Sequence, residues 1–166
     1  FATKPAWSGN IELYSEGVEI LPKPPRHANR DELPVNHPVI FKERSGWLLR
    51  RGVPVNLLAT SNDKDELEIP KGHTISSYCL HGSSTEARVS GQIRFDSPIL
   101  GIIYDSVMLD ETDRTLGARR TNYPVGISYR GIEPGDIENK KTIVLGEDGR
   151  TIRFSFSAPQ FDQFRI

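Results

Sequence analysis

Proline and glycine recur along the whole chain and divide it into short segments, which leaves little room for long helices. The 166 residues include 12 prolines and 14 glycines. Several of the segments between them alternate apolar and polar residues, as Val89, Ile93 and Phe95 illustrate. Alternation with a period of two predicts strands that bury one face. The pattern therefore predicts an all-β domain, a β-sandwich or a jelly-roll-like fold.

The clearest strands form a hairpin at residues 140–158, KKTIVLGEDGRTIRFSFSA, with its turn at Glu147-Asp148-Gly149. A second hairpin is predicted from VIFKER and WLLRRGVPVNLL, with a turn at Ser45-Gly46 between them. The apolar run at residues 98–104 predicts a strand buried on both faces. Further strands are expected at residues 9–20, 74–82 and 87–97.

One short helix is predicted near residues 110–117, in LDETDRTLG. Asp110 suits the N-cap, and Asp113, three residues later, suits the acid of a capping box. Gly117 suits the left-handed position that often ends a helix. This segment is the only one in the sequence with a clear helical signature.

The length favours a single globular domain. Residues 21–38 contain five prolines, so residues 1–37 are expected to form an N-terminal strand or strands and a Pro-rich arm. Residues 38–166 are expected to form the β-sandwich domain. The formal charge of -1 gives no general attraction to nucleic acid. The longest apolar run is too short to span a bilayer.

Acidic residues around the predicted helix raise the question of a cation site. Calcium binds several oxygen ligands, which makes Asp105, Asp110 and Asp113 weak candidates. Their spacing does not match an EF-hand loop. Helix capping explains Asp110 and Asp113 without a metal, so the capped helix is the favoured interpretation. No other cofactor or metal is expected.

The chain has no catalytic signature: it lacks a nucleophile elbow, an H-E-x-x-H motif and a Gly-rich phosphate loop. The one cysteine, Cys79, lies in a predicted strand, where a buried thiol is usually inert. His73 and His81 are separated by about 27 Å if the strand between them is extended, so they are poor metal partners. The protein is therefore expected not to be an enzyme. The 22 acidic residues are enough to supply the pair of carboxylates that a polysaccharide hydrolase needs, so this activity stays an alternative.

Two groups of charged residues lie inside apolar segments. YRGIE contains Arg130 and Glu133, and FDQFRI contains Asp162 and Arg165. Because burial of an unpaired charge is costly, we interpret these residues as ion-paired determinants of the fold.

Aromatic and basic residues suggest binding surfaces. Trp7, Trp47 and Tyr123 have the planar rings that stack on sugars, although such residues more often lie in a core. Phe1 belongs to an N-terminal segment that we expect to reach a neighbouring subunit. The basic residues Arg50, Arg51, Arg119 and Arg120 are expected to bind an anionic polysaccharide or a partner, or to form a solvated face.

Four segments carry a resemblance to a known family: ISSYCLHG, SGQIRFDSPILGIIYDSVMLDETDRTLG, NYPVGISYRGIE and TIRFSFSAPQFDQFRI. In this order they resemble exported bacterial proteins of unassigned function, many of which carry a PEP-CTERM (exosortase-type) sorting tail. The resemblance covers roughly residues 38–166. The segment HGSSTEAR departs from it, and the chain ends without a sorting tail. The resemblance implies export to the cell surface, and Phe1 fits a mature chain whose signal has been removed.

These observations together predict a non-catalytic extracellular structural protein, a component of a surface layer, filament or matrix. It is expected to associate with itself or with other surface components through sheet edges and its N-terminal arm. The alternative is an extracellular glycan-binding β-sandwich module that calcium assists. Neither prediction involves nucleic acid or a membrane span.

Overall fold

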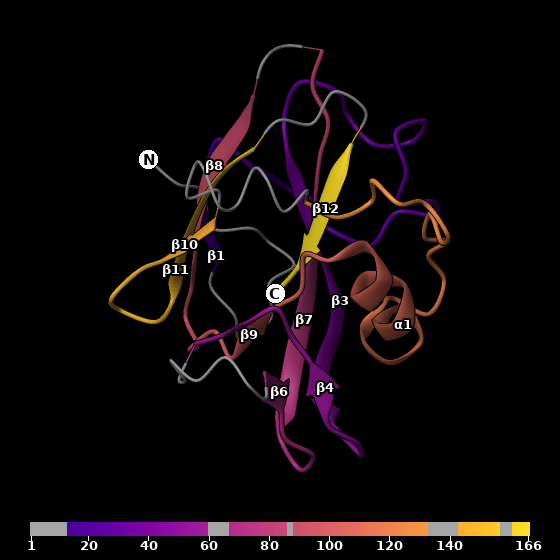
Figure 1. The fold of residues 1–166 in the computed structure, drawn as a ribbon. Coiled ribbons are helices and arrows are strands. Elements are labelled where there is room, and N and C mark those ends of the chain that lie inside the picture. The colour runs from indigo at the N-terminus through magenta and orange to yellow at the C-terminus, as the bar shows by residue number, and fades with distance from the viewer. Residues whose placement is uncertain (1–12, 60–66, 86–87, 133–142, 157–160) are drawn as a thin grey trace.

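Two four-stranded sheets face each other and form the body of the protein (Figure 1). The structure is a computed structural model, and it describes residues 13–59, 67–85, 88–132, 143–156 and 161–166. Strands dominate these residues, with one helix beside them. The prediction of an all-β, sandwich-like fold with one short helix is confirmed.

The first sheet contains the predicted C-terminal hairpin. Its strand order is β1-β8-β11-β10, and all its pairs are antiparallel. The hairpin turn includes Gly149, whose φ of 65° suits glycine. The strands are β1 (Leu13–Glu16), β8 (Val89–Phe95), β10 (Ile143–Leu145) and β11 (Thr151–Phe156).

The second sheet has the order β12-β7-β3-β2, in which only β2 runs parallel to its neighbour. Two small strand pairs, β4 with β6 and β5 with β9, flank it. Its strands are β2 (Glu19–Ile20), β3 (Val39–Leu48), β7 (Thr74–Gly82) and β12 (Asp162–Arg165). The small pairs are β4 (Val53–Pro54), β5 (Leu57–Leu58), β6 (Glu68–Ile69) and β9 (Gly101–Ile102).

The main core lies between the two sheets. Ile93, Ile152 and Phe156 of the first sheet are fully buried with Leu80 and Phe164 of the second. These residues alternate with polar neighbours along their strands, so each sheet presents one apolar face to the other. Burial of this surface is the main term that holds the sheets together.

The outer face of the second sheet is covered as well. Helix α1 (Ser106–Leu116) lies on it, on the side away from β8, β10 and β11 (Figure 1). The hydroxyl of Ser77 in β7 donates to the carbonyl of Leu116 at 2.7 Å. Ala28 and Leu33 pack on the same sheet, against Phe41. The described part of the N-terminal arm thus packs on its own chain, and residues 1–12 lie outside the described residues.

Strand β3 replaces the hairpin predicted at Ser45-Gly46, and that prediction is wrong. Lys42 pairs with Tyr78 while Arg44 pairs with Ser77, so Glu43 is an extra residue on β3. A second extra residue follows before Trp47, which pairs with Ile75. Both are β-bulges within one continuous strand. A Ser-Gly pair is a turn signal in sequence, but inside a strand it also marks a bulge.

The conformation of Gly46 in the second bulge leads to a prediction about stability. This residue has a φ of 58°, and a Cβ placed on it would have no atom within 4 Å. Gly46→Ala is therefore expected to lower the free energy of unfolding by about 1 kcal/mol through backbone strain alone. Gly46→Asn should cost less, because asparagine tolerates this region better. Urea denaturation of both variants measures the difference, and equal losses would contradict the strain argument.

The helix differs from its prediction at both ends. It begins at Ser106, and Asp105 is the N-cap, whose side chain accepts from the backbone N–H groups of Val107 and Met108. Gly117 has a φ of -65° and is extended, not left-handed. The strand predicted at residues 98–104 is reduced to β9. Asp110 and Asp113 therefore lie within the helix, which frees their carboxylates for another role.

Candidate functional site

Polar side chains gather on the outer face of the second sheet, beneath α1. The strand register places them in rows: Arg165, Cys79 and Phe41 are neighbours across β12, β7 and β3. Gln163 and His81 lie in the next row. Side chains two residues apart on a strand share a face, so these groups point toward the helix.

Arg165 lies at the centre of this network. Its guanidinium binds both oxygens of Glu43, with Nε–Oε2 at 2.7 Å and Nη2–Oε1 at 2.8 Å. Nη2 also donates to Asp113 Oδ1 at 2.8 Å, and Nη1 donates to Thr112 Oγ1 at 2.7 Å. The side chain is buried, and every nitrogen has an acceptor. This fork geometry is the strongest form of an arginine–carboxylate pair.

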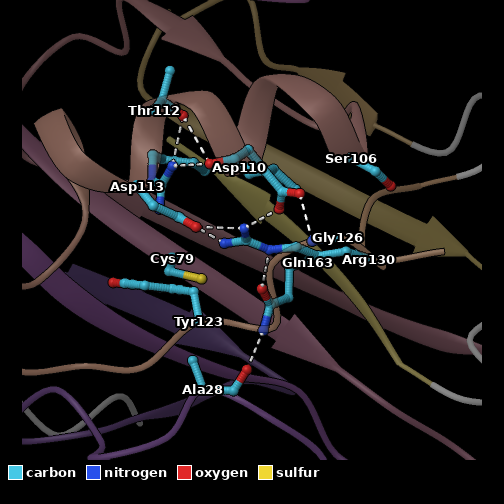
Figure 2. A network of polar contacts seen from close by, with 12 residues as sticks. Ala28, Cys79, Ser106, Asp110, Thr112, Asp113, Tyr123, Gly126, Arg130 and Gln163 are labelled. Carbon is cyan, nitrogen blue, oxygen red and sulfur yellow. Dashed lines mark hydrogen bonds and ion pairs between the residues drawn. The ribbon is translucent and has the colours of Figure 1, made fainter. Parts of the chain in front are cut away.

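Arg130 approaches the helix from the segment that follows it. Figure 2 shows its guanidinium between the two carboxylates of α1 and the amide of Gln163. Nη1 donates to Asp110 Oδ1 at 2.7 Å and to Asp113 Oδ2 at 2.6 Å, and Nη2 donates to Asp113 Oδ1 at 2.7 Å. Asp113 is thereby shared by both arginines. One turn of α1 separates the two aspartates, which places them on the same face of the helix.

Tyr123 joins the two arginines. Its ring centroid lies 5.2 Å from the Arg130 guanidinium carbon and 5.6 Å from that of Arg165. Its hydroxyl donates to Glu43 Oε1 at 2.6 Å and accepts from the backbone N–H of Ala118 at 2.9 Å. Contacts of this kind between a guanidinium and an aromatic ring are favourable when water is excluded.

The electrostatics of the network keep both arginines charged. Burial by itself lowers the pKa of Arg130, but hydrogen bonds and charge from Asp113 and Asp110 raise it above its usual value. For Arg165, burial likewise lowers the pKa, and Glu43 and Asp113 raise it well above the usual value. Burial and the neighbouring Glu43 raise the pKa of Tyr123, which keeps its phenol protonated. Both arginines are therefore charged and the Tyr123 phenol is neutral near neutral pH.

The thiol and the imidazole of this face are also held in unreactive states. Burial raises the pKa of the Cys79 thiol, so the nucleophilic thiolate is disfavoured. Burial lowers the pKa of His81 to about 4, so this histidine is neutral at pH 7. Its ring stacks on Phe161 with centroids 5.4 Å apart, and its Nδ1 lies 3.1 Å from the Gln163 amide nitrogen. These groups are arranged for packing.

The sequence pointed to Arg130 and Arg165, but not to their carboxylate partners. Their ion pairs are formed with Asp110, Asp113 and Glu43. Glu133 lies outside the described residues, and Asp162 is buried on β12, where it pairs with Gly82. Glu43 was missed, although a signal exists. It continues the buried positions Val39 and Phe41 of β3, where a charge requires a partner.

The three calcium candidates have separate roles. Asp105 caps α1, and Asp110 and Asp113 bind Arg130. The remaining oxygen of Asp110 accepts from the backbone N–H of Gly126 at 2.8 Å. Within the described ranges, no group of three or more acidic, histidine or cysteine residues is arranged to hold a metal ion. Both carboxylate oxygens of Asp110 and of Asp113 are bound to N–H groups instead.

The aromatic candidates also differ in where the structure places them. Tyr123 is part of the buried network and is not free to stack on a sugar. Trp47 is half-buried on β3, with the guanidinium carbons of Arg44 and Arg119 at 4.7 and 5.7 Å from its ring. Phe1 and Trp7 lie outside the described residues. Trp47 is therefore the one candidate of this group that the structure places at a surface.

A cavity of about 440 Å³ lies beside β7, and Arg165 of the ionic network is among the residues that line it. Aliphatic side chains such as Val53, Val55 and Ile99 form much of its wall, with Ser76 and His73 among the polar residues. The described residues that line it include no aspartate or glutamate. Glycoside hydrolysis normally uses two carboxylates, which this lining does not supply.

Comparisons with protein-family models, with curated proteins and with solved structures produced no match to this chain. The resemblance to PEP-CTERM-type exported proteins therefore stays a prediction from the sequence. In the part of the chain that the structure describes, no helix is long and apolar enough to cross a membrane.

Proposed function

We propose that this protein is a non-catalytic extracellular assembly module that associates with further copies or with other surface components. The observation that carries the proposal is the ionic network beneath α1. Its arginines and carboxylates bind one another, and the adjacent thiol and imidazole are buried and uncharged. Groups that are paired in this way are not available to a substrate, and removal of one partner destabilises the fold.

The sheet edges offer the means of association. Among the described residues, β10 pairs only with β11, and β1 pairs only with β8. Val144 at the centre of β10 is 41% exposed, and Tyr14 of β1 is 38% exposed. Edge strands with exposed apolar residues bind added strands through their free backbone groups. The N-terminal residues before β1 are our candidate for such an added strand.

If the protein assembles through its sheet edges, a charge at Val144 of β10 should reduce that assembly. The protein is expected to show a mass above that of the monomer in light scattering at high concentration. Val144→Lys should shift it to the monomer, because a charge on an edge strand opposes strand addition. The control is Val125→Lys, which changes a more exposed valine, at 64%, outside the strands. A wild-type protein that stays monomeric at high concentration would overturn the assembly proposal.

A second candidate is glycan binding, which one observation favours. Trp47 and the guanidinium groups of Arg44 and Arg119 form a compact aromatic and basic surface. Such surfaces recognise acidic ligands through hydrogen bonds from the guanidinium groups.

A further inference from the structure

Two arginines from different segments meet at the ring of Trp47. Arg44 and Trp47 lie on β3, and their pairing with Ser77 and Ile75 of β7 places both on the side of α1. Arg119 follows the end of α1. The first β-bulge places Arg44 on the same face as Glu43, and the second returns Trp47 to that face, because each bulge shifts the alternation of side chains by one residue.

Arg44 and Arg119 have no carboxylate within ion-pair distance in the part of the chain that the structure describes, in contrast to Arg130 and Arg165. Within the described ranges, the guanidinium of Arg44 forms a single long hydrogen bond, 3.5 Å from Nη2 to the carbonyl of Arg114, and its buried Nε has no acceptor. Burial and the positive charge of Arg119 lower the pKa of Arg44 by more than the nearby Glu43 and Tyr123 raise it. An anion placed between them would remove this repulsion.

We propose that Arg44, Trp47 and Arg119 form a binding site for the carboxylate groups of an acidic polysaccharide. Each guanidinium offers a planar fork of N–H donors that matches a carboxylate, and the indole ring holds the forks in place. This inference rests on the glycan-binding candidate and is independent of assembly through sheet edges.

The charge of the rest of the molecule favours a polysaccharide over a nucleic acid. The whole chain carries a formal charge of -1, so the surface outside the site adds no general attraction for a densely charged polymer. Nucleic-acid binding depends on neutralising many phosphates at once. A polyuronate carries one carboxylate on each sugar, which a compact pair of arginines is able to bind.

The test measures binding of the full chain to immobilised polygalacturonate, with neutral dextran and duplex DNA as the other probes. Arg44→Gln together with Arg119→Gln should weaken binding to polygalacturonate about tenfold or more, because charge-assisted hydrogen bonds are lost. The matched control is Arg51→Gln with Arg120→Gln, which removes the same charge from exposed arginines without contact to Trp47. This control should stay within about twofold of wild type, since unpaired surface charges contribute little.

The fluorescence of Trp47 reports binding at the proposed site directly. The chain has two tryptophans, so Trp7→Phe leaves Trp47 as the only one, and its emission should change when polygalacturonate binds and not with dextran. Equal loss in the two double variants would show diffuse attraction and overturn the site while glycan binding stands. Binding to neither polysaccharide would overturn both, and duplex DNA bound as tightly as polygalacturonate would overturn the assignment to polysaccharide. Unchanged unfolding midpoints show that the variants are folded.

Discussion

Replacing Arg165 by methionine is expected to lower the free energy of unfolding by about 3–5 kcal/mol. The substitution leaves the Glu43 carboxylate, whose side chain is 0% exposed, without its bidentate partner. Tyr123 would remain its only described hydrogen-bond donor. An uncompensated buried charge costs more than the ion pair contributes, which is why removal of one partner is more harmful than removal of both.

Urea denaturation followed by circular dichroism measures this loss. The double variant Glu43→Gln with Arg165→Met should be more stable than Arg165→Met alone, because no charge is left unpaired. Arg50→Met, at an exposed position, is the control and should change stability by less than about 0.5 kcal/mol. If Arg165→Met behaves like Arg50→Met, the network does not stabilise the fold as argued above.

Acidification from pH 7 to pH 4 is expected to remove up to about 3 kcal/mol of stability through His81 alone. The pKa of His81 is about 4 in the folded protein, below its usual 6.5, because the ring is buried. As the pH falls through 6.5, the unfolded chain takes up a proton on this histidine while the folded protein does not. The unfolded state is therefore favoured, and the stability contributed by neutral His81 is lost between pH 6.5 and pH 4.

The measurement is the free energy of unfolding as a function of pH for wild type and His81→Gln. Glutamine removes the titration and retains an acceptor for the Gln163 amide, so the slope between pH 6.5 and pH 4 should decrease. His73→Gln changes an exposed histidine and should keep the wild-type slope. Equal slopes for wild type and His81→Gln would show that this histidine does not govern the acid sensitivity.

Local patterns were sufficient for much of the fold. The alternation at residues 87–97, and the hairpin at Glu147-Asp148-Gly149, correspond to β8 and to the β10–β11 pair. Strand β7 matches its predicted residues, 74–82. These elements were predictable because side-chain period and turn chemistry act over a few neighbouring residues.

The errors arose where one local signal has two structural meanings. Ser45-Gly46 is a turn signal in the sequence, but it forms a bulge in the structure. Strand β7 pairs with β3 on both sides of this point, which keeps β3 a single strand. Asp110 was predicted as the N-cap, but Asp105 also suits that position and occupies it in the structure. The buried Arg130 favours the longer helix, because it binds Asp110 and Asp113 within that helix. Tertiary contacts decided both cases.

The sequence by itself determined that this chain forms a strand-rich sandwich with one helix, and that Arg130 and Arg165 need charged partners. Both conclusions follow from local rules: alternation sets which side chains are buried, and a buried charge must be paired. Only the tertiary structure decided which carboxylates pair with them, and that Arg44 and Arg119 meet at Trp47. These contacts join strands, a helix and loops that are far apart in sequence, so their geometry depends on how the whole chain packs.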